Sequence, residues 1–139
     1  MTPKIILIHP PIAKPSEPPA GIAKLSSCLR ANNVLHQVID ANLEGIIYLT
    51  HATARADAPS GRWNVRACKN LEANLDALQN ISTFSNQNRY SRAVLDVNHV
   101  LNIAGKPNGV HLSLSDYADS KRSPVKSSDL IQAAETPEA

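Results

Sequence analysis

The chain has 139 residues, a length that fits one domain with a buried core and leaves no room for a second full domain. Its formal net charge is +2, and basic and acidic residues are interspersed, so composition gives no support for binding to nucleic acid. No apolar run approaches the length of a membrane span, and the first residues lack the apolar stretch of a signal peptide. We therefore expect a protein with neither a membrane nor a nucleic acid as partner.

The first forty residues predict a strand, a helix and a second strand that form a parallel βαβ unit. The unbroken apolar run over residues 5–8 is typical of an internal parallel strand that is covered on both faces. The proline-rich stretch over residues 10–19 predicts a stiff, exposed loop. Apolar residues at helical spacing then predict a helix that stops at Asn32 and Asn33, followed by a strand over residues 35–41.

The rest of the chain predicts helices and one extended segment. Residues 43–55 predict a helix with Asn42 as its N-cap. One amphipathic face runs from Trp63 to Ile81 and a second from Tyr90 to Ala104, so each stretch predicts one helix. The second helix is expected to end at Gly105 and Pro107. The last predictions are a half-buried extended segment in which Val110, Leu112 and Leu114 alternate with polar residues, and a short helix over residues 129–135 behind Ser127 or Ser128.

These elements predict a helix-rich α/β fold with a short parallel sheet and a Rossmann-like βαβ start. We expect the domain to cover residues 1–118, because the composition becomes polar from Asp119 onward. Residues 119–139 are then a polar tail, or a linker toward a catalytic domain that this chain lacks. The length and the polar end favour a domain taken from a longer protein.

Candidate ligand contacts lie where the two predicted strands end, because open α/β sheets bind ligands at the carboxyl ends of their strands. A helix N-terminus with a glycine also allows close approach of an anion. The candidates are His9, Pro10, Pro11, Gly21, Asp40 and Asn42.

His9, Asp40 and the prolines each have a structural alternative that the sequence leaves open. His9 either contacts a ligand or donates a hydrogen bond to the loop backbone. Asp40 either binds ribose hydroxyls, as an acid does at this place in dinucleotide-binding folds, or serves as a cap or turn residue. The prolines of the loop form either a rigid wall against a flat ligand or a simple structural break.

Other reactive side chains favour structural roles. Asp96 and His99 are one helical turn apart but lie off the apolar face, so we expect a solvated pair and not a catalytic dyad. Trp63 is expected in the core. Cys28 and Cys68 are too few for an iron–sulfur cluster, and we expect buried, inert and reduced thiols in a cytoplasmic protein. No histidine spacing indicates a metal site, and no catalytic residue is assigned.

The start of the chain resembles the cobalamin-binding (B12-binding) domain found at the N-terminus of many radical S-adenosylmethionine enzymes. The resemblance rests on three stretches: Ile5-Ile-Leu-Ile-His9-Pro10-Pro11, then Pro18-Pro19-Ala-Gly21-Ile22-Ala23-Lys-Leu25, and finally Val38-Ile-Asp40-Ala41-Asn42. They cover less than a third of the chain. The Asp-x-His-x-x-Gly signature, which supplies a cobalt ligand in one branch, and the Cys-x-x-x-Cys-x-x-Cys motif of the radical domain are both absent from the sequence.

This resemblance implies a partial cobalamin-binding-like fold that binds the cofactor or docks, and leaves the chemistry to the cofactors. The partner implied is a C-terminal radical S-adenosylmethionine domain of the same protein, which would hold the 4Fe–4S cluster and S-adenosylmethionine. The parent enzyme is then expected to be a methyltransferase or a related enzyme. Two alternatives stay open. One is a cobalamin-free protein-interaction module, and the other is a free-standing nucleotide-binding protein that uses Gly21 and Asp40.

Overall fold

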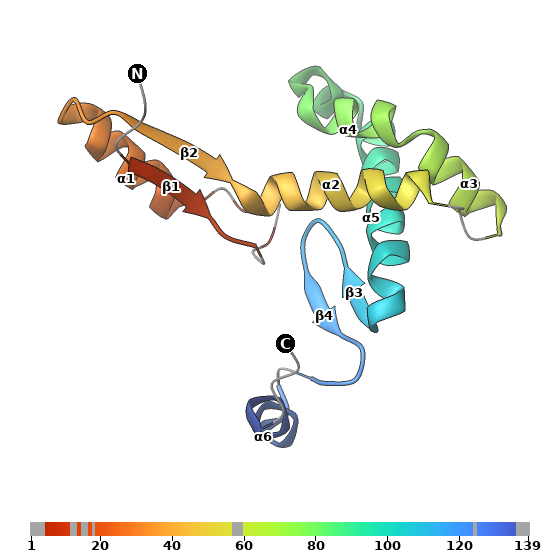
Figure 1. Ribbon diagram of the computed structural model, residues 1–139. Helices are drawn as coiled ribbons and strands as arrows, with labels where there is room; N and C mark the ends of the chain where they lie inside the picture. Colours follow the sequence, from red (N-terminus) through yellow and green to blue (C-terminus); the bar gives the residue numbers. More distant parts are fainter. Residues whose placement is uncertain are drawn as a thin grey trace.

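The computed structural model describes residues 5–11, 14, 17, 19–56, 60–123 and 125–135. Figure 1 shows a βαβ unit at one end of the molecule, a group of helices at the other, and one long helix that joins them. A small β-hairpin lies against the helical group, and the last helix stands apart beyond the hairpin. The prediction of a helix-rich α/β fold with a short parallel sheet is confirmed.

The βαβ unit contains β1 (Ile5–His9), α1 (Ala20–Ala31) and β2 (His36–Asp40). The strands pair in parallel, and the register runs from Ile5 opposite His36 to His9 opposite Asp40. The predicted helix stop is confirmed, because Asn32 is the C-cap of α1 and Asn33 takes the left-handed conformation at φ 55°. The loop expected over residues 10–19 lies partly outside the described residues.

The sheet is less covered than the apolar run predicted. It has two strands, and neither strand nor α1 contains a fully buried residue. Ile6 and Ile8 alternate with the residues that face α1, and they are 53% and 57% exposed. The expectation of an internal strand covered on both faces is therefore wrong, because α1 covers one face and the other is left open.

The long connecting helix is α2 (Ala41–Arg55), which begins directly after β2 without a loop. Its N-cap is Asp40, whose carboxylate accepts a hydrogen bond from the Leu43 backbone N–H at 2.9 Å. Asn42 was expected to be this cap, and that prediction is wrong. Asn42 instead lies in the first turn of α2 and is 4% exposed.

The helical group contains α3 (Arg62–Lys69), α4 (Leu71–Gln79), the 3-10 helix η1 (Ile81–Ser85) and α5 (Gln87–Gly105). The single helix expected from Trp63 to Ile81 is thus wrong, because it is broken at Asn70, a residue type of low helix propensity. Ile81 lies in η1 and is 84% exposed, so it is not part of the apolar face. The helix predicted over Tyr90 to Ala104 is confirmed as α5.

The core lies among these helices, at their contact with α5. Fully buried apolar side chains come from α3, α4 and α5, and the partly buried Ile46 of α2 and Leu112 of the hairpin pack against them. The buried cluster is Ala67, Leu71, Val97, Val100 and Leu101. As composition predicted, it is built from small and aliphatic residues.

The chain continues through the 3-10 helix η2 (Lys106–Asn108) into an antiparallel hairpin, β3 (Val110–Leu112) and β4 (Tyr117–Asp119). The half-buried segment predicted there is confirmed as β3, while β4 was not predicted, and it spans the boundary expected between residues 118 and 119. The short C-terminal helix is confirmed as α6 (Ser127–Glu135). Figure 1 shows α6 away from the core, at the end of the segment that follows β4.

Gly45 and Gly105 provide a matched pair for testing the packing. A Cβ on Gly45 would meet nothing within 4 Å, so Gly45→Ala should raise the free energy of unfolding by about 1 kcal/mol through helix propensity. A Cβ on Gly105 would collide with the Val110 carbonyl oxygen, so Gly105→Ala should lower it by about 1 to 3 kcal/mol. Urea denaturation of both variants measures the two values, and a change of the same sign in both would contradict this packing.

Candidate functional site

A pocket of about 680 Å³ lies beside the first half of α2, near the predicted ligand edge. Its apolar walls come from α2, from the end of α5 and from β3, and include Ile46, Leu49 and Leu112. Polar side chains also line it. They include Lys14, Asn42, Asn108, Ser113, Asp116 and Tyr117. A concave apolar site with a few polar groups is the usual form of a small-molecule site, and this volume falls in the usual range.

Two of the six sequence-predicted contacts line this pocket. Pro11 reaches it from the end of β1, and Asn42 reaches it from the first turn of α2. The expected juxtaposition of the two strand exits is therefore present, because β1 and β2 end side by side at His9 and Asp40. Pro11 and Asn42 each lie two residues beyond those ends.

The other four candidates lie close by in the chain but are not lining residues. His9 is half-buried at the end of β1, and the exposed Pro10 follows it. Asp40 uses its carboxylate to cap α2, which is the structural alternative that the sequence left open. Gly21 lies exposed in the first turn of α1, and this turn has neither a side-chain cap nor an acidic residue.

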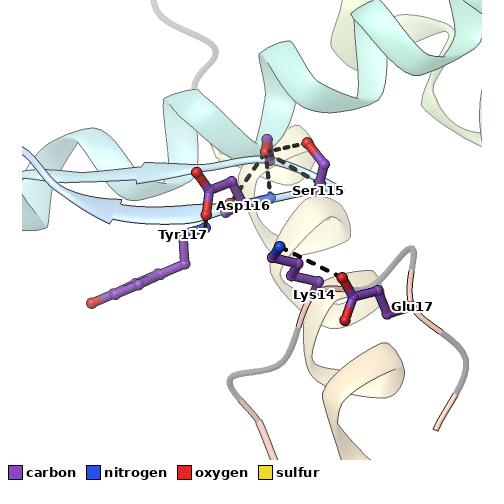
Figure 2. Close-up of polar contacts among 6 residues, drawn as sticks. Lys14, Glu17, Ser115, Asp116 and Tyr117 are labelled. Atoms are coloured by element: carbon purple, nitrogen blue, oxygen red, sulfur yellow. Dashed lines mark hydrogen bonds and ion pairs between the residues drawn. The ribbon is translucent and has the colours of Figure 1, made fainter. Parts of the chain in front are cut away.

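The far wall of the pocket is the turn of the hairpin, which sequence reasoning missed. Ser113 organises this turn, because its hydroxyl accepts hydrogen bonds from the backbone N–H groups of Ser115 at 3.3 Å and Asp116 at 2.9 Å (Figure 2). The Asp116 carboxylate accepts one from the Tyr117 N–H at 2.9 Å. The turn is attached to the core, since the Leu114 N–H donates to the Asn98 side chain of α5 at 2.8 Å. The run of Ser and Asp residues before Tyr117 is a turn signal that could have revealed this hairpin.

Among the described residues that line the pocket, Lys14 carries a positive charge and Asp116 a negative one. Figure 2 shows Lys14 on the loop after β1, near the hairpin turn that carries Asp116. Lys14 Nζ lies 3.5 Å from a carboxylate oxygen of Glu17, and both side chains are more than half exposed. An exposed pair of this kind holds its partners only weakly. Lys14 can therefore turn toward an anionic group of a ligand.

A second cluster of polar side chains lies where α3 packs on α5, and it overturns two expectations. Asp96 is 2% exposed and not solvated, because its carboxylate accepts hydrogen bonds from Trp63 Nε1 and Arg66 Nη2, both at 3.0 Å. Trp63 was expected in the core but is 48% exposed. Its ring stacks on the imidazole of His99 with 3.8 Å between centroids, and His99 Nε2 donates to the Asn64 side-chain oxygen at 2.6 Å. Asp96 and His99 are therefore each held by side chains of α3, namely Trp63 and Arg66 for Asp96, and Asn64 for His99.

The electrostatics of Asp96 follow from these contacts. Burial would raise the pKa of its carboxyl group, but hydrogen bonds from Trp63 and Arg66, with the positive charge of Arg66, outweigh burial and hold the pKa below its usual value. The carboxylate is therefore charged at neutral pH. Its role is to position the side chains that donate to it, which are Trp63, Arg66 and Asn74.

The cysteines differ from each other. Cys28 is exposed on α1, so the expectation that it is buried is wrong, whereas Cys68 is half-buried beside the core. Burial raises the pKa of the Cys68 thiol and keeps it protonated at neutral pH. Both are free thiols.

Comparison with known proteins adds no relative: no family model, no curated protein sequence and no solved structure matches this chain. Within the part of the chain that the structure describes, no three His, Cys, Asp or Glu side chains gather as a metal site requires. No helix in those same ranges has both the length and the apolar character needed to cross a bilayer. The functional conclusion therefore rests on the residues and their geometry.

The Asp96 cluster predicts a specific pH dependence of stability. Asp96→Asn should lower the free energy of unfolding by about 1 to 3 kcal/mol at pH 7, because an amide replaces a charged acceptor that serves several donors. The folded pKa is lowered, so the stabilisation by the carboxylate is complete above the unfolded pKa of about 4 and is lost as pH falls through the folded value. Urea denaturation between pH 7 and pH 3 should show the wild type and the variant converging.

Asp76→Asn is the matched control for this prediction, because Asp76 is an exposed carboxylate on α4. Its free energy of unfolding should stay within about 0.5 kcal/mol of the wild type at every pH. A gap between wild type and Asp96→Asn that does not change with pH would contradict the assigned role of the carboxylate.

Proposed function

We propose that this chain is a cofactor-binding module that resembles the N-terminal B12-binding domain of radical S-adenosylmethionine enzymes, and that it contributes binding and not chemistry. The observation that carries the proposal is the pocket reached by Pro11 and Asn42 at the exits of β1 and β2. Two of the three stretches that resemble the B12-binding domain, residues 5–11 and 38–42, end at this edge of the sheet. The pocket and these two stretches therefore lie at one place.

The chemistry of the pocket is compatible with part of a cobalamin molecule. A corrin ring is a broad apolar surface with amide groups on its rim. Ile46 and Leu49 offer it an apolar wall, and the lining residues Asn108 and Tyr117 carry polar groups of the kind that bind amides. Lys14 supplies a positive charge for the phosphate that cobalamin carries.

In this role the protein holds and orients the cofactor. Bound cobalamin would supply the cobalt–carbon chemistry, while an adjoining radical domain would hold the 4Fe–4S cluster and S-adenosylmethionine. Pro11 cannot rotate about φ, so its side of the pocket loses little entropy when a ligand binds. Asn42 is positioned by the capped first turn of α2.

Titration with hydroxocobalamin tests this proposal, and Gly45 offers a matched pair of variants. Gly45 lines the pocket, and its Cβ position is open, so Gly45→Phe should place a ring in the pocket and weaken binding by about tenfold or more. Gly45→Ala adds one methyl group and should bind as the wild type does. The readouts are the absorbance spectrum of the corrin and the rise in melting temperature at saturating ligand.

The outcomes separate the proposal from its rival. Wild-type binding that Gly45→Phe abolishes and Gly45→Ala retains would support a corrin site at the pocket. The absence of any spectral change or melting shift in the wild type would exclude cobalamin binding. Equal affinity in all three proteins would place the cofactor elsewhere on the chain.

A cobalamin-free interaction module is the second candidate, and the open face of the sheet favours it. Ile6 and Ile8 are exposed, and the half-buried Ile39 lies opposite Ile8 in the register. Parallel sheets are usually covered on both faces, so this isoleucine face is suited to contact with another protein surface. Docking would use this face, whereas cofactor binding would use the pocket.

Replacement of Ile6 and Ile8 by Ser tests whether this face is accessible. The double variant should bind less of the apolar dye ANS, because the dye adsorbs to exposed apolar surface. Its melting temperature should change little, since both side chains are already more than half exposed. A large drop in melting temperature would instead mean that the two isoleucines are part of the packed fold.

A further inference from the structure

A second groove lies between α3 and the first half of α5, and it shares no lining residue with the pocket at the strand exits. Its volume is about 450 Å³. It contains one aromatic ring, two guanidinium groups and small polar side chains. These side chains belong to Trp63, Arg66, Asn88, Ser91 and Arg92.

Trp63 is held in this groove as a rigid platform. His99 stacks against the Trp63 ring with an interplanar angle of 7°, and the indole N–H is bonded to Asp96. Nearly half of the Trp63 surface nevertheless remains exposed. A ring that is already fixed can accept a second flat group with little loss of side-chain entropy.

Arg66 and Arg92 line the groove, and the two helical segments that form it are rich in basic residues. Arg62, Arg66 and Lys69 recur at i, i+4 and i+7 along α3, and so share one face of it. Together with two arginines of α5, residues 62–69 and 87–96 contain five of the chain's fourteen basic residues but only one of its twelve acidic residues. The whole chain has a net charge of only +2, so the charge is concentrated at this end.

The single acid offsets part of this charge, because Asp96 lines the groove and pairs with Arg66 at 3.0 Å. Asp96 is buried, and its carboxylate is occupied by Trp63, Arg66 and Asn74. Arg66 gives Asp96 one nitrogen and keeps its other N–H donors, and its side chain is 54% exposed. Arg92 is exposed and has no ion-pair partner within the described ranges. Both guanidinium groups can therefore bind an anion.

We propose that this groove binds a nucleotide, with the base stacked on Trp63 and a phosphate held by Arg66 and Arg92. Guanidinium groups bind phosphate oxygens in a bidentate manner, and aromatic platforms stack on bases of any sequence. Asn88 and Ser91 offer further hydrogen-bond partners beside them. The proposal is independent of the cofactor pocket, since the two sites use different residues.

The chain provides its own probe, because Trp63 is its single tryptophan. Stacking of a base on this ring should quench tryptophan fluorescence, so a titration with AMP reads the site directly. Inorganic phosphate should compete with AMP and reverse the quenching, because it binds the arginines without stacking. Rising salt should weaken AMP binding, as it does for exposed charge pairs.

Arg92→Ala is the decisive variant and Arg30→Ala its matched control, since Arg30 is exposed on α1, far from the groove in the chain. Loss of one charged phosphate contact should weaken AMP binding by about tenfold in Arg92→Ala and leave Arg30→Ala unchanged. Both replaced side chains are exposed, so both variants should fold. Equal affinity in the two variants would overturn the assignment, as would unquenched fluorescence at millimolar AMP.

The same titration separates a free nucleotide from single-stranded nucleic acid. A short oligothymidylate that binds much more tightly than AMP, with a steep salt dependence, would identify a strand as the natural ligand. Equal or weaker binding of the oligonucleotide would identify a free nucleotide. Either result supports the groove as a base-and-phosphate site, provided that Arg92→Ala weakens it.

Discussion

The close packing of other elements around α5 is the constraint on which the structure depends. Val97, Val100 and Leu101 are completely buried, and α2, α3, α4 and the hairpin all contact this helix. At its end, Gly105 lets the backbone of Val110 approach so closely that a side chain would not fit. Both sites are consequences of this packing. The end of α5 closes the pocket behind α2, and its first turns form one side of the groove with α3.

The local elements were largely readable from the sequence, because each has a signal that depends on near neighbours. The apolar run before Pro10, the Asn32–Asn33 stop and the apolar spacing along residues 90–104 predicted β1, the end of α1 and α5. The predictions were wrong where contacts between distant parts of the chain determine whether a residue is buried. The exposure of Ile6 and Ile8 depends on how many strands the sheet has, and periodicity along one strand does not report this.

The candidate sites show the same division. The meeting of the strand exits could be predicted from chain order alone, and Pro11 and Asn42 do reach a pocket there. The opposite wall comes from the hairpin around Asp116, about 75 residues further along the chain, and no local pattern links the two. The prediction that Asp96 is solvated was wrong for a related reason. It lies off the main apolar stripe of α5, and burial came from Trp63 and Arg66 of another helix.

The direct passage from β2 into α2 has a mechanical consequence. α2 contains 15 residues, and at about 1.5 Å per residue it is a stiff rod of about 22 Å. One end is fixed to the sheet through the Asp40 cap, and the other passes over the core. Because no loop separates β2 from α2, a change in the direction of β2 would be passed directly to α2. A ligand bound at the strand ends would therefore act on a segment that is directly continuous with α2 and, through it, with the helical group.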